Sequence, residues 1–285
     1  MGCTIKNKPS WTWLVKAALP LLATACLAVS AHAAAHTYTF AVVPQFEQRK
    51  LFAIWKPIVD ELEKRTGLSF KLVATLTIQN FERELSKGSF DFVYTNPYHI
   101  LMVSQSQGYI PLVRDETPLR GILVVRKDSP IQDISELEGK TVAFPSANAI
   151  GASLLMRADL SRLYHVTVVP LYVKTHSSVY FHVVNGLTAA GGGVEKTLHE
   201  QDASVQEALR VLYTTREIPS HPIAAHPRIS KALRDEVQQA LLEMSRTREG
   251  QEWLDKVPIH KMVATSMADY TPMLSWGLES LWEED

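Results

Sequence analysis

The stretch YTFAVVPQFEQRKLFAIWKPIVDELEKRTGLSFKLVA, residues 38–74, decides the fold of this chain. It opens with an aromatic and β-branched run that Pro44 closes, a pattern typical of a strand. Apolar residues then recur at helical spacing from Leu51 to Leu62, and Gly67 supplies a helix stop. A second strand is predicted over residues 70–74. Such a strand–helix–strand unit places two parallel strands in one sheet, with the helix on its face.

The same alternation continues along the chain and starts again near Arg126. In this second part, Asp133 and Glu136 have the spacing of a capping box for a short helix. We therefore expect two α/β lobes, with the strands Leu119–Val125 and Val211–Thr214 crossing between them. The other predicted elements are helices near 78–87, 148–162 and 177–184 and after 227, and strands at 90–94, 141–144 and 166–173.

The N-terminus has the layout of a secretory signal peptide. Three lysines precede a short apolar run, Ala17–Val29, and Ala31-His32-Ala33 follows it as a cleavage site. The run is shorter than the roughly 20 residues that a membrane-spanning helix needs. We therefore expect residues 1–33 to be removed on export to the periplasm, with cleavage after Ala35 as the alternative.

Both cysteines, Cys3 and Cys26, lie inside this N-terminal segment. Lipidation of Cys26 is an alternative to simple cleavage, although Ala23-Thr24-Ala25 before it is a poor lipidation signal. After cleavage the mature chain would hold no cysteine. Disulfides, thiolate metal sites and cysteine nucleophiles are then excluded together.

The composition is that of an ordinary globular protein, with 46% hydrophobic residues, 21% charged residues and a formal net charge of −1. The charges are dispersed, so no basic stripe indicates a nucleic acid or a membrane surface as a partner. The sequence has no nucleophile elbow, no H-E-x-x-H helix and no dinucleotide fingerprint. No two of its ten histidines have metal-site spacing. We expect no catalytic residue, no cofactor and no metal.

Donor-rich segments follow several predicted strands, at the points where helices begin. In α/β lobes ligands bind beyond the carboxyl ends of the strands, and helix N-termini offer unpaired N–H groups to an anion. These segments contain no Lys or Arg, which predicts an oxyanion site built from neutral donors. Helix capping is the alternative role of Ser146 and Asn148, and Tyr94 could simply end a buried strand. The predicted ligand-binding residues are Gln45, Phe46, Tyr94, Thr95, Asn96, Ser146, Asn148, His176, Ser177 and Ser178.

Three further features have an ordinary structural interpretation. Gly191-Gly192-Gly193 fails the Walker pattern and predicts a tight turn or a close backbone approach at the edge of the second lobe. Arg120, near the predicted hinge, is either a cation for the ligand or a solvated side chain. His221 follows a Pro-Ser turn and could line the cleft, and we expect the histidines other than His176 and His221 to lie mostly at the surface.

Short motifs spread over nearly the whole mature chain carry a family likeness. In chain order they are G-S-F-D-F-V (88–93), N-P-Y (96–98), S-P-I (129–131), L-E-G-K-T-V-A (137–143), F-P-S (144–146) before Gly151, and R-E-I-P-S (216–220). Together they resemble the phosphate, phosphite and phosphonate binding proteins of ABC transporters, which are type II periplasmic binding proteins.

The resemblance implies a two-lobed α/β fold in which a mainly parallel sheet flanked by helices forms each lobe and two strands form the hinge. It places lobe 1 at residues 36–122 and 216–285, and lobe 2 at residues 123–215. It also implies a monomer that closes around a small oxyanion in the periplasm. Its partner would be an ABC permease, and it would have no enzymatic activity.

Two departures from the family's phosphonate members concern the ligand. Ser146-Ala147-Asn148-Ala149-Ile150-Gly151 stands where they carry a Ser-Thr-Ser-Gly turn, and Ala189 stands where they tend to have an acid that can hold a substrate amine. The chain resembles more closely the branch of oxyanion receptors and periplasmic sensors, so a membrane histidine kinase is the alternative partner. Hydroxyl and amide donors suit phosphorus, arsenic and sulfur oxyanions alike, which leaves the central atom open.

Overall fold

The structure is a computed structural model that describes residues 1–4, 36–257 and 259–283. Apart from Met1–Thr4, the predicted signal peptide lies outside the described residues. Among the helices of the described part, none is long and apolar enough to cross a membrane.

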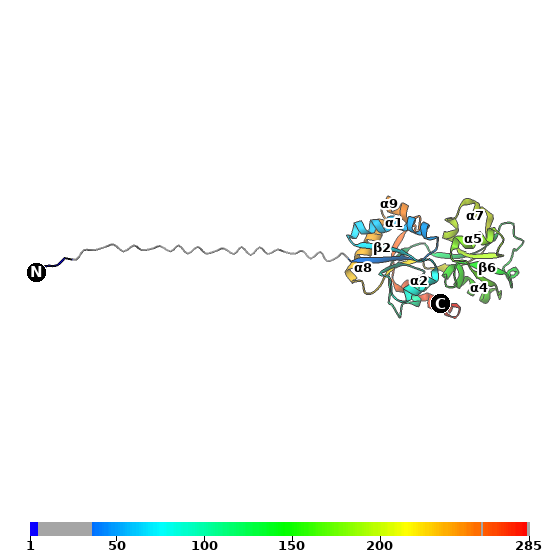
Figure 1. Cartoon of the computed structure of the whole chain (residues 1–285). Helices are drawn as coiled ribbons and strands as arrows, with labels where there is room; N and C mark the ends of the chain where they lie inside the picture. Colours follow the sequence, from blue (N-terminus) through cyan, green and yellow to red (C-terminus); the bar gives the residue numbers. More distant parts are fainter. Residues whose placement is uncertain (5–35, 258, 284–285) are drawn as a thin grey trace. The chain divides into compact units, whose positions relative to one another are not determined.

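The first lobe is built on a six-stranded mixed sheet with the order β11-β4-β10-β3-β1-β2. Strand β1 pairs in parallel with β2 and β3, whereas β10, β4 and β11 join by antiparallel pairing. Figure 1 shows its helices around this sheet. The elements are β1 (Thr37–Val42), α1 (Gln48–Thr66), β2 (Ser69–Ala74), α2 (Ile78–Ser86), β3 (Phe92–Tyr94), α3 (Pro97–Met102), β4 (Ile110–Asp115), β10 (Pro222–Ala225), α8 (Lys231–Met244), α9 (Arg248–Leu254) and β11 (Met262–Ala264), followed by the 3₁₀ turns Met267–Asp269, Thr271–Trp276 and Leu278–Leu281.

The second lobe is built on a five-stranded mixed sheet with the order β7-β6-β8-β5-β9. Strand β6 pairs in parallel with β7 and β8, and β5 pairs antiparallel with β8 and β9. The elements are β5 (Leu119–Arg126), the 3₁₀ turn Ile134–Leu137, β6 (Thr141–Phe144), the π-helical turn Ile150–Leu154, α4 (Leu155–Leu163), β7 (Val169–Tyr172), α5 (His176–Val184), β8 (Ala190–Val194), α6 (Glu195–His199), α7 (Ala203–Ala208) and β9 (Leu209–Ile218).

Local sequence signals account for the first predicted unit. Helix α1 buries one apolar face that includes Trp55 and Leu62, and it ends at Gly67, whose φ of 66° is the left-handed conformation that glycine adopts readily. In the second lobe the predicted capping box is present, with the Asp133 side chain and the Glu136 side chain each accepting a backbone N–H. The helix predicted over 148–162 begins instead as the π-helical turn.

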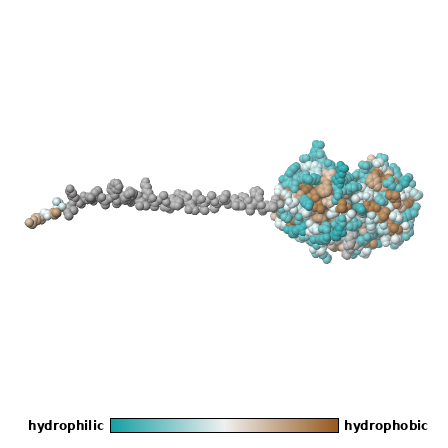
Figure 2. Space-filling view, in the orientation of Figure 1, coloured by the Kyte–Doolittle hydropathy of each residue, from teal (hydrophilic) through white to brown (hydrophobic). Residues whose placement is uncertain are grey.

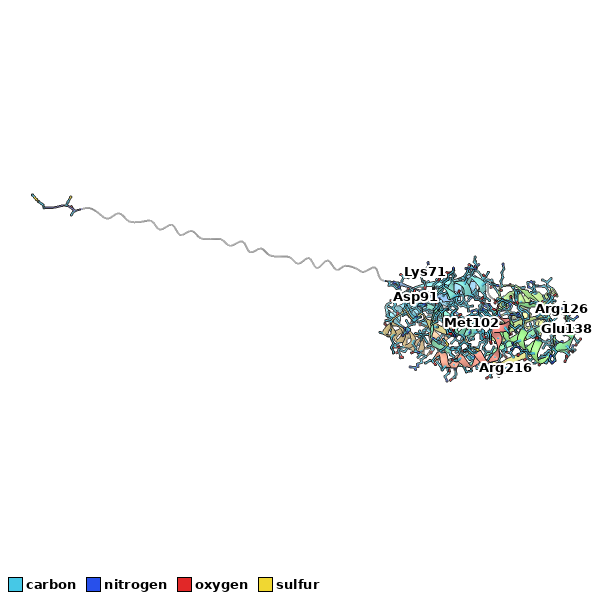
Figure 3. The ribbon with its side chains drawn as sticks, turned by 90° about the horizontal axis from the view of Figure 1, so that it is seen from below. Lys71, Asp91, Met102, Arg126, Glu138 and Arg216 are labelled. Atoms are coloured by element: carbon cyan, nitrogen blue, oxygen red, sulfur yellow. The ribbon has the colours of Figure 1, made fainter. Side chains whose placement is uncertain are left out.

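The chain crosses between the sheets twice, through two short links. Residues 116–118 join β4 of the first sheet to β5 of the second, and residues 219–221 join β9 back to β10. Figure 3 shows Lys71 and Asp91 at one end of this two-lobed body, and Arg126 and Glu138 at the other. The two-lobed α/β fold is confirmed, with mixed rather than mainly parallel sheets. The proposed lobe boundaries at 122 and 215 fall inside β5 and β9.

The glycine run 191–193 is not a turn at the edge of the lobe. It lies in β8, the middle strand of the second sheet. A Cβ on Gly192 would lie 2.0 Å from the Ala152 carbonyl oxygen, and one on Gly193 would lie 2.3 Å from the Tyr180 hydroxyl. The predicted close backbone approach is therefore present, and it is what requires glycine here.

The main hydrophobic core surrounds the first sheet and reaches across the lobe boundary. Its buried cluster includes Ile150, Leu154 and Val194 of the second lobe, so the two lobes pack against each other. Two smaller clusters fill the second lobe. At the surface, apolar patches lie among mainly hydrophilic side chains on both lobes, as Figure 2 shows for one face.

Candidate ligand-binding cleft

Strand ends from both sheets meet where the lobes face each other. Val42 of β1 is in register with Tyr94 of β3, so Gln45 and Thr95 follow neighbouring strand ends of the first lobe. The two lobes touch at these points. The His176 N–H donates to the Gln45 carbonyl oxygen at 3.3 Å, and the Asn96 amide donates to the Asn148 carbonyl oxygen at 3.1 Å.

A small cavity of about 20 Å³ lies at this junction. Such a volume holds about one water molecule, so a ligand can enter only if the lobes separate. A larger cavity of about 320 Å³ lies between α2, α3 and Trp282, but no strand end lines it, so we place the candidate site in the smaller one. The smaller cavity is lined by Gln45, Phe46, Tyr94, Asp115, Leu119, Val194, Lys196, Thr197, Ser220, His221, Val257 and Ile259.

Tyr94 and His221 form the aromatic wall of this cavity. Their rings stack with centroids 5.4 Å apart, and both side chains are buried. Burial, and after it the nearby Asp115 carboxylate, raises the pKa of Tyr94, so its hydroxyl stays protonated as a donor. The Gln45 amide nitrogen lies 3.4 Å from His221 Nε2. Because that nitrogen can only donate, the contact requires an unprotonated Nε2 on His221.

The second imidazole of the cleft, His176, begins helix α5. It is buried, and its Nδ1 lies 3.3 Å from the Thr197 hydroxyl oxygen. Burial lowers the pKa of His176 to about 4. Burial, and after it the His176 imidazole, lowers the pKa of His221 to about 3. Both rings are therefore neutral at pH 7 and present hydrogen-bonding groups rather than positive charge.

Two buried hydroxyls at strand-to-helix turns have no hydrogen-bond partner among the described residues. Thr95 is 0% exposed and Ser146 is 1% exposed, and neither side-chain oxygen makes such a bond. Most buried polar side chains are paired, so two orphaned hydroxyls at turns from opposite lobes make this region a candidate for binding a polar ligand. Ser146 lies at the level of Val194, because the parallel register pairs Val142 with Ala190.

The remaining predicted residues have other contacts in this arrangement. The Asn148 side chain donates to Glu82 at 3.1 Å and exchanges two hydrogen bonds with the Glu283 backbone. Asn96 caps α3 by accepting the Tyr98 N–H. The Ser178 hydroxyl and N–H both contact Thr175 Oγ1, Ser177 is buried beside His176, and Phe46 lies under the Lys50 ammonium, 4.1 Å from the ring centroid. Whether these residues contact the ligand stays a prediction.

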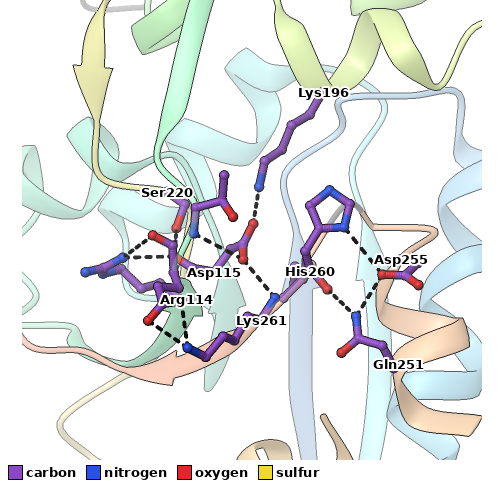
Figure 4. Close-up of polar contacts among 11 residues, drawn as sticks. Arg114, Asp115, Lys196, Ser220, Gln251, Asp255, His260 and Lys261 are labelled. Carbon is purple, nitrogen blue, oxygen red and sulfur yellow. Dashed lines mark hydrogen bonds and ion pairs between the residues drawn. The ribbon is translucent and has the colours of Figure 1, made fainter. Parts of the chain in front are cut away.

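Sequence reasoning did not place Asp115, Lys196, Thr197 or Ser220 in the site, and it named His221 only as a residue that could line the cleft. Asp115 ends strand β4 and is 2% exposed, and the Lys196 ammonium pairs with its carboxylate across the lobe boundary (Figure 4). His221 lies in the link between β9 and β10. The strand-end rule would have found Lys196, because it lies two residues after the end of β8, but that strand was taken for a turn. Arg120 pairs with Glu217 at an exposed position and does not line the cavity.

Residues 40–270 match the family described as the periplasmic substrate-binding protein of the phosphonate ABC transporter. The chain belongs to this family. It is therefore a periplasmic substrate-binding protein of the phosphonate transporter type, and both the predicted family and the predicted class of function are confirmed.

Solved structures of other binding proteins share the fold of this substrate-binding protein. A binding protein component of an ABC phosphonate transporter from Pseudomonas aeruginosa is 13% identical, with a TM-score of 0.77 over 85% of each chain. The PhnD1 protein of Prochlorococcus marinus, solved in complex with methylphosphonate, is 14% identical, with a TM-score of 0.77 over 86% of this chain and 98% of that one. At such identities the likeness concerns the fold.

One curated relative is a signalling protein. The tetrathionate sensor histidine kinase of Salmonella typhimurium is 26% identical over an alignment of 216 residues that covers 66% of this chain. The match spans only 36% of the kinase, so this chain corresponds to about a third of that protein's length.

Proposed function

We propose that this substrate-binding protein captures a small oxyanion and delivers it to an ABC permease. The observation that carries the proposal is the pair of buried, unpartnered hydroxyls, Thr95 and Ser146, at turns from opposite lobes. Neutral His176 and His221, which both contact Gln45, add hydrogen-bonding groups at the junction of the lobes, and the protonated Tyr94 hydroxyl adds a donor. An anion held by such dipoles needs little balancing positive charge.

The proposed cycle follows from the way the lobes meet. Closure brings Gln45 against His176 and Asn96 against Asn148, so a ligand between the lobes is enclosed by groups from both. A permease can then recognise the closed shape. We further propose that the protein acts as a monomer, that residues 1–33 direct it to the periplasm, and that it catalyses nothing.

A thermal-shift screen of the chain lacking residues 1–33 tests the proposal. Phosphate, phosphite, methylphosphonate, arsenate, sulfate and tetrathionate form the panel, with leucine and arginine as non-oxyanion controls. A ligand at 100 times its Kd adds about 2.7 kcal/mol to the free energy of unfolding, which is easily measured. Stabilisation by amino acids but by no oxyanion would contradict the proposal. Turnover of phosphate or sulfate esters would contradict the non-enzymatic part.

The relative's name supports a second candidate, a freestanding receptor that reports an oxyanion to a membrane histidine kinase. Both candidates use the same closed form. Reconstitution separates them, because a transporter partner responds to the loaded protein by raised ATP hydrolysis and a sensor partner by altered autophosphorylation. A response of the kinase alone would replace the transport proposal with the sensing one.

A further inference from the structure

An acidic side chain lines the cavity in which we place the anion. Asp115 is 2% exposed and is fixed by groups of its own lobe and the adjoining link. Its Oδ1 accepts the Lys261 N–H at 3.1 Å and the Thr117 N–H at 3.4 Å. The Ser220 hydroxyl also donates to its backbone carbonyl oxygen. The carboxylate is thus held in place independently of the second lobe.

The partner of this carboxylate arrives from the other lobe. Lys196, in the first turn of α6, pairs through its ammonium with Asp115 Oδ2, and its side chain is only 18% exposed (Figure 4). An N–H donor with positive charge and a negative acceptor therefore stand side by side at one edge of the cavity. Tyr94, Thr197 and His221 line the same cavity.

We propose that Asp115 and Lys196 together select oxyanions that carry a proton donor of their own; this inference rests on the proposed function. An ionised carboxylate can only accept hydrogen bonds, and an ammonium can only donate them. A ligand with one ionised oxygen and one O–H or N–H matches both groups, the ionised oxygen facing Lys196 and the donor facing Asp115. Hydrogen phosphate, hydrogen arsenate and singly ionised alkylphosphonates have this edge.

Fully ionised oxyanions lack the proton donor that such a ligand would present to Asp115. Sulfate and tetrathionate carry no proton at neutral pH, so one of their oxygens would face the buried Asp115 carboxylate without a hydrogen and with like charge. A hydrogen bond to a charged group is worth about ten- to hundredfold in affinity, and an unmatched pair loses at least that factor. The protein should therefore prefer phosphate to sulfate by this factor or more.

A simple latch between the lobes is the competing explanation of the Asp115–Lys196 pair. The chain offers a matched control for it, because Lys50 and Glu200 also pair across the lobe boundary, at 3.9 Å, without lining the cavity. A latch loses closure energy whichever ligand is bound. A selective pair changes the ratio between ligands.

Calorimetry with phosphate and sulfate decides between them, using wild type, Asp115→Asn and Glu200→Gln. We expect Asp115→Asn to weaken phosphate binding ten- to hundredfold and to leave sulfate binding equal or stronger, while Glu200→Gln keeps the wild-type ratio. Equal weakening of both ligands by Asp115→Asn, or wild-type affinities that do not differ, would overturn the inference alone. A wild-type protein that binds no oxyanion would overturn the proposed function itself.

A measurement on the wild-type protein tests the inference even if the Asp115→Asn variant does not fold. Methylphosphonate loses its last proton as the pH rises above neutral, so its affinity should fall about tenfold for each pH unit beyond that ionisation. In this range the two cleft imidazoles, His176 and His221, stay neutral and the Tyr94 hydroxyl stays protonated. An affinity that stays constant across this range would refute the selection.

Discussion

Acidification should destabilise this protein through the two imidazoles buried in its cleft. Burial lowers the pKa of His176 to about 4 and that of His221 to about 3, whereas an unfolded chain titrates its histidines near pH 6.5. The contribution of these two histidines to the free energy of unfolding is complete above about pH 6.5, and it is lost as the pH falls toward their pKa values in the folded chain. In that window the unfolded chain binds up to two protons more than the folded one.

The size of the loss follows from linkage. Each proton bound only by the unfolded chain lowers the free energy of unfolding by about 1.4 kcal/mol per pH unit, so two histidines give about 2.7 kcal/mol per unit between about pH 6 and pH 4.5. A typical domain has only about 5–15 kcal/mol in total. Anion binding opposes the loss, because a bound negative charge favours the protonated imidazoles.

Urea unfolding between pH 7.5 and 4.5 measures this dependence. We expect the double variant His176→Gln, His221→Gln to lose most of the slope, since neither glutamine titrates. His260→Gln serves as the matched control, because the His260 side chain is 58% exposed. A double variant with the same pH dependence as wild type would show that the two imidazoles are not the buried neutral groups described above.

Four other substitutions test separate parts of the structure. Thr95→Ala or Ser146→Ala should each lower oxyanion affinity by about ten- to hundredfold in calorimetry. Neither substitution should lower the melting temperature, because neither hydroxyl has a hydrogen-bond partner to lose. Unchanged affinity would show that the ligand binds elsewhere. Asn148→Ala should lower the melting temperature, because it removes three contacts to Glu82 and Glu283, and a change in affinity alone would contradict this. Gly192→Ala should unfold the protein or lower Tm by about 5 °C or more, since its Cβ would lie 2.0 Å from a carbonyl oxygen; an unchanged Tm would contradict the close packing of β8.

Local sequence patterns predict much of this fold, but they do not predict how distant segments pair. Helix α1 and its stop at Gly67, strand β6 and the Asp133–Glu136 capping box follow from spacing and residue type alone. The antiparallel half of the first sheet depends on β10 and β11, strands of four and three residues that return late in the chain. Segments so short have too few residues to show a period, so only the tertiary structure reveals them.

The site divides in the same way. Gln45, Phe46 and Tyr94 line the cavity and could be predicted, because a strand end followed by a helix start is visible in the sequence. Asp115 and His221 come from strand ends and links at the crossing between the lobes, where topology rather than pattern sets the neighbours. The three glycines in β8 give no sign of a strand in the sequence, so the position of Lys196 two residues beyond its end could not be predicted.

In the proposed site, the arrangement of charge would let a protein with little positive charge near its ligand discriminate between anions. Hydroxyls, imidazoles and backbone dipoles attract any small oxyanion, because each presents a donor without regard to the ligand's protonation. Asp115 makes binding depend on the protonation of the ligand, because its buried carboxylate is fixed by backbone N–H groups and repels any unprotonated oxygen. Lys196 reaches it from the second lobe, so the pair forms across the lobe boundary. On the proposed site, affinity would come from the neutral donors, and selectivity from Asp115 and its partner across the lobe boundary.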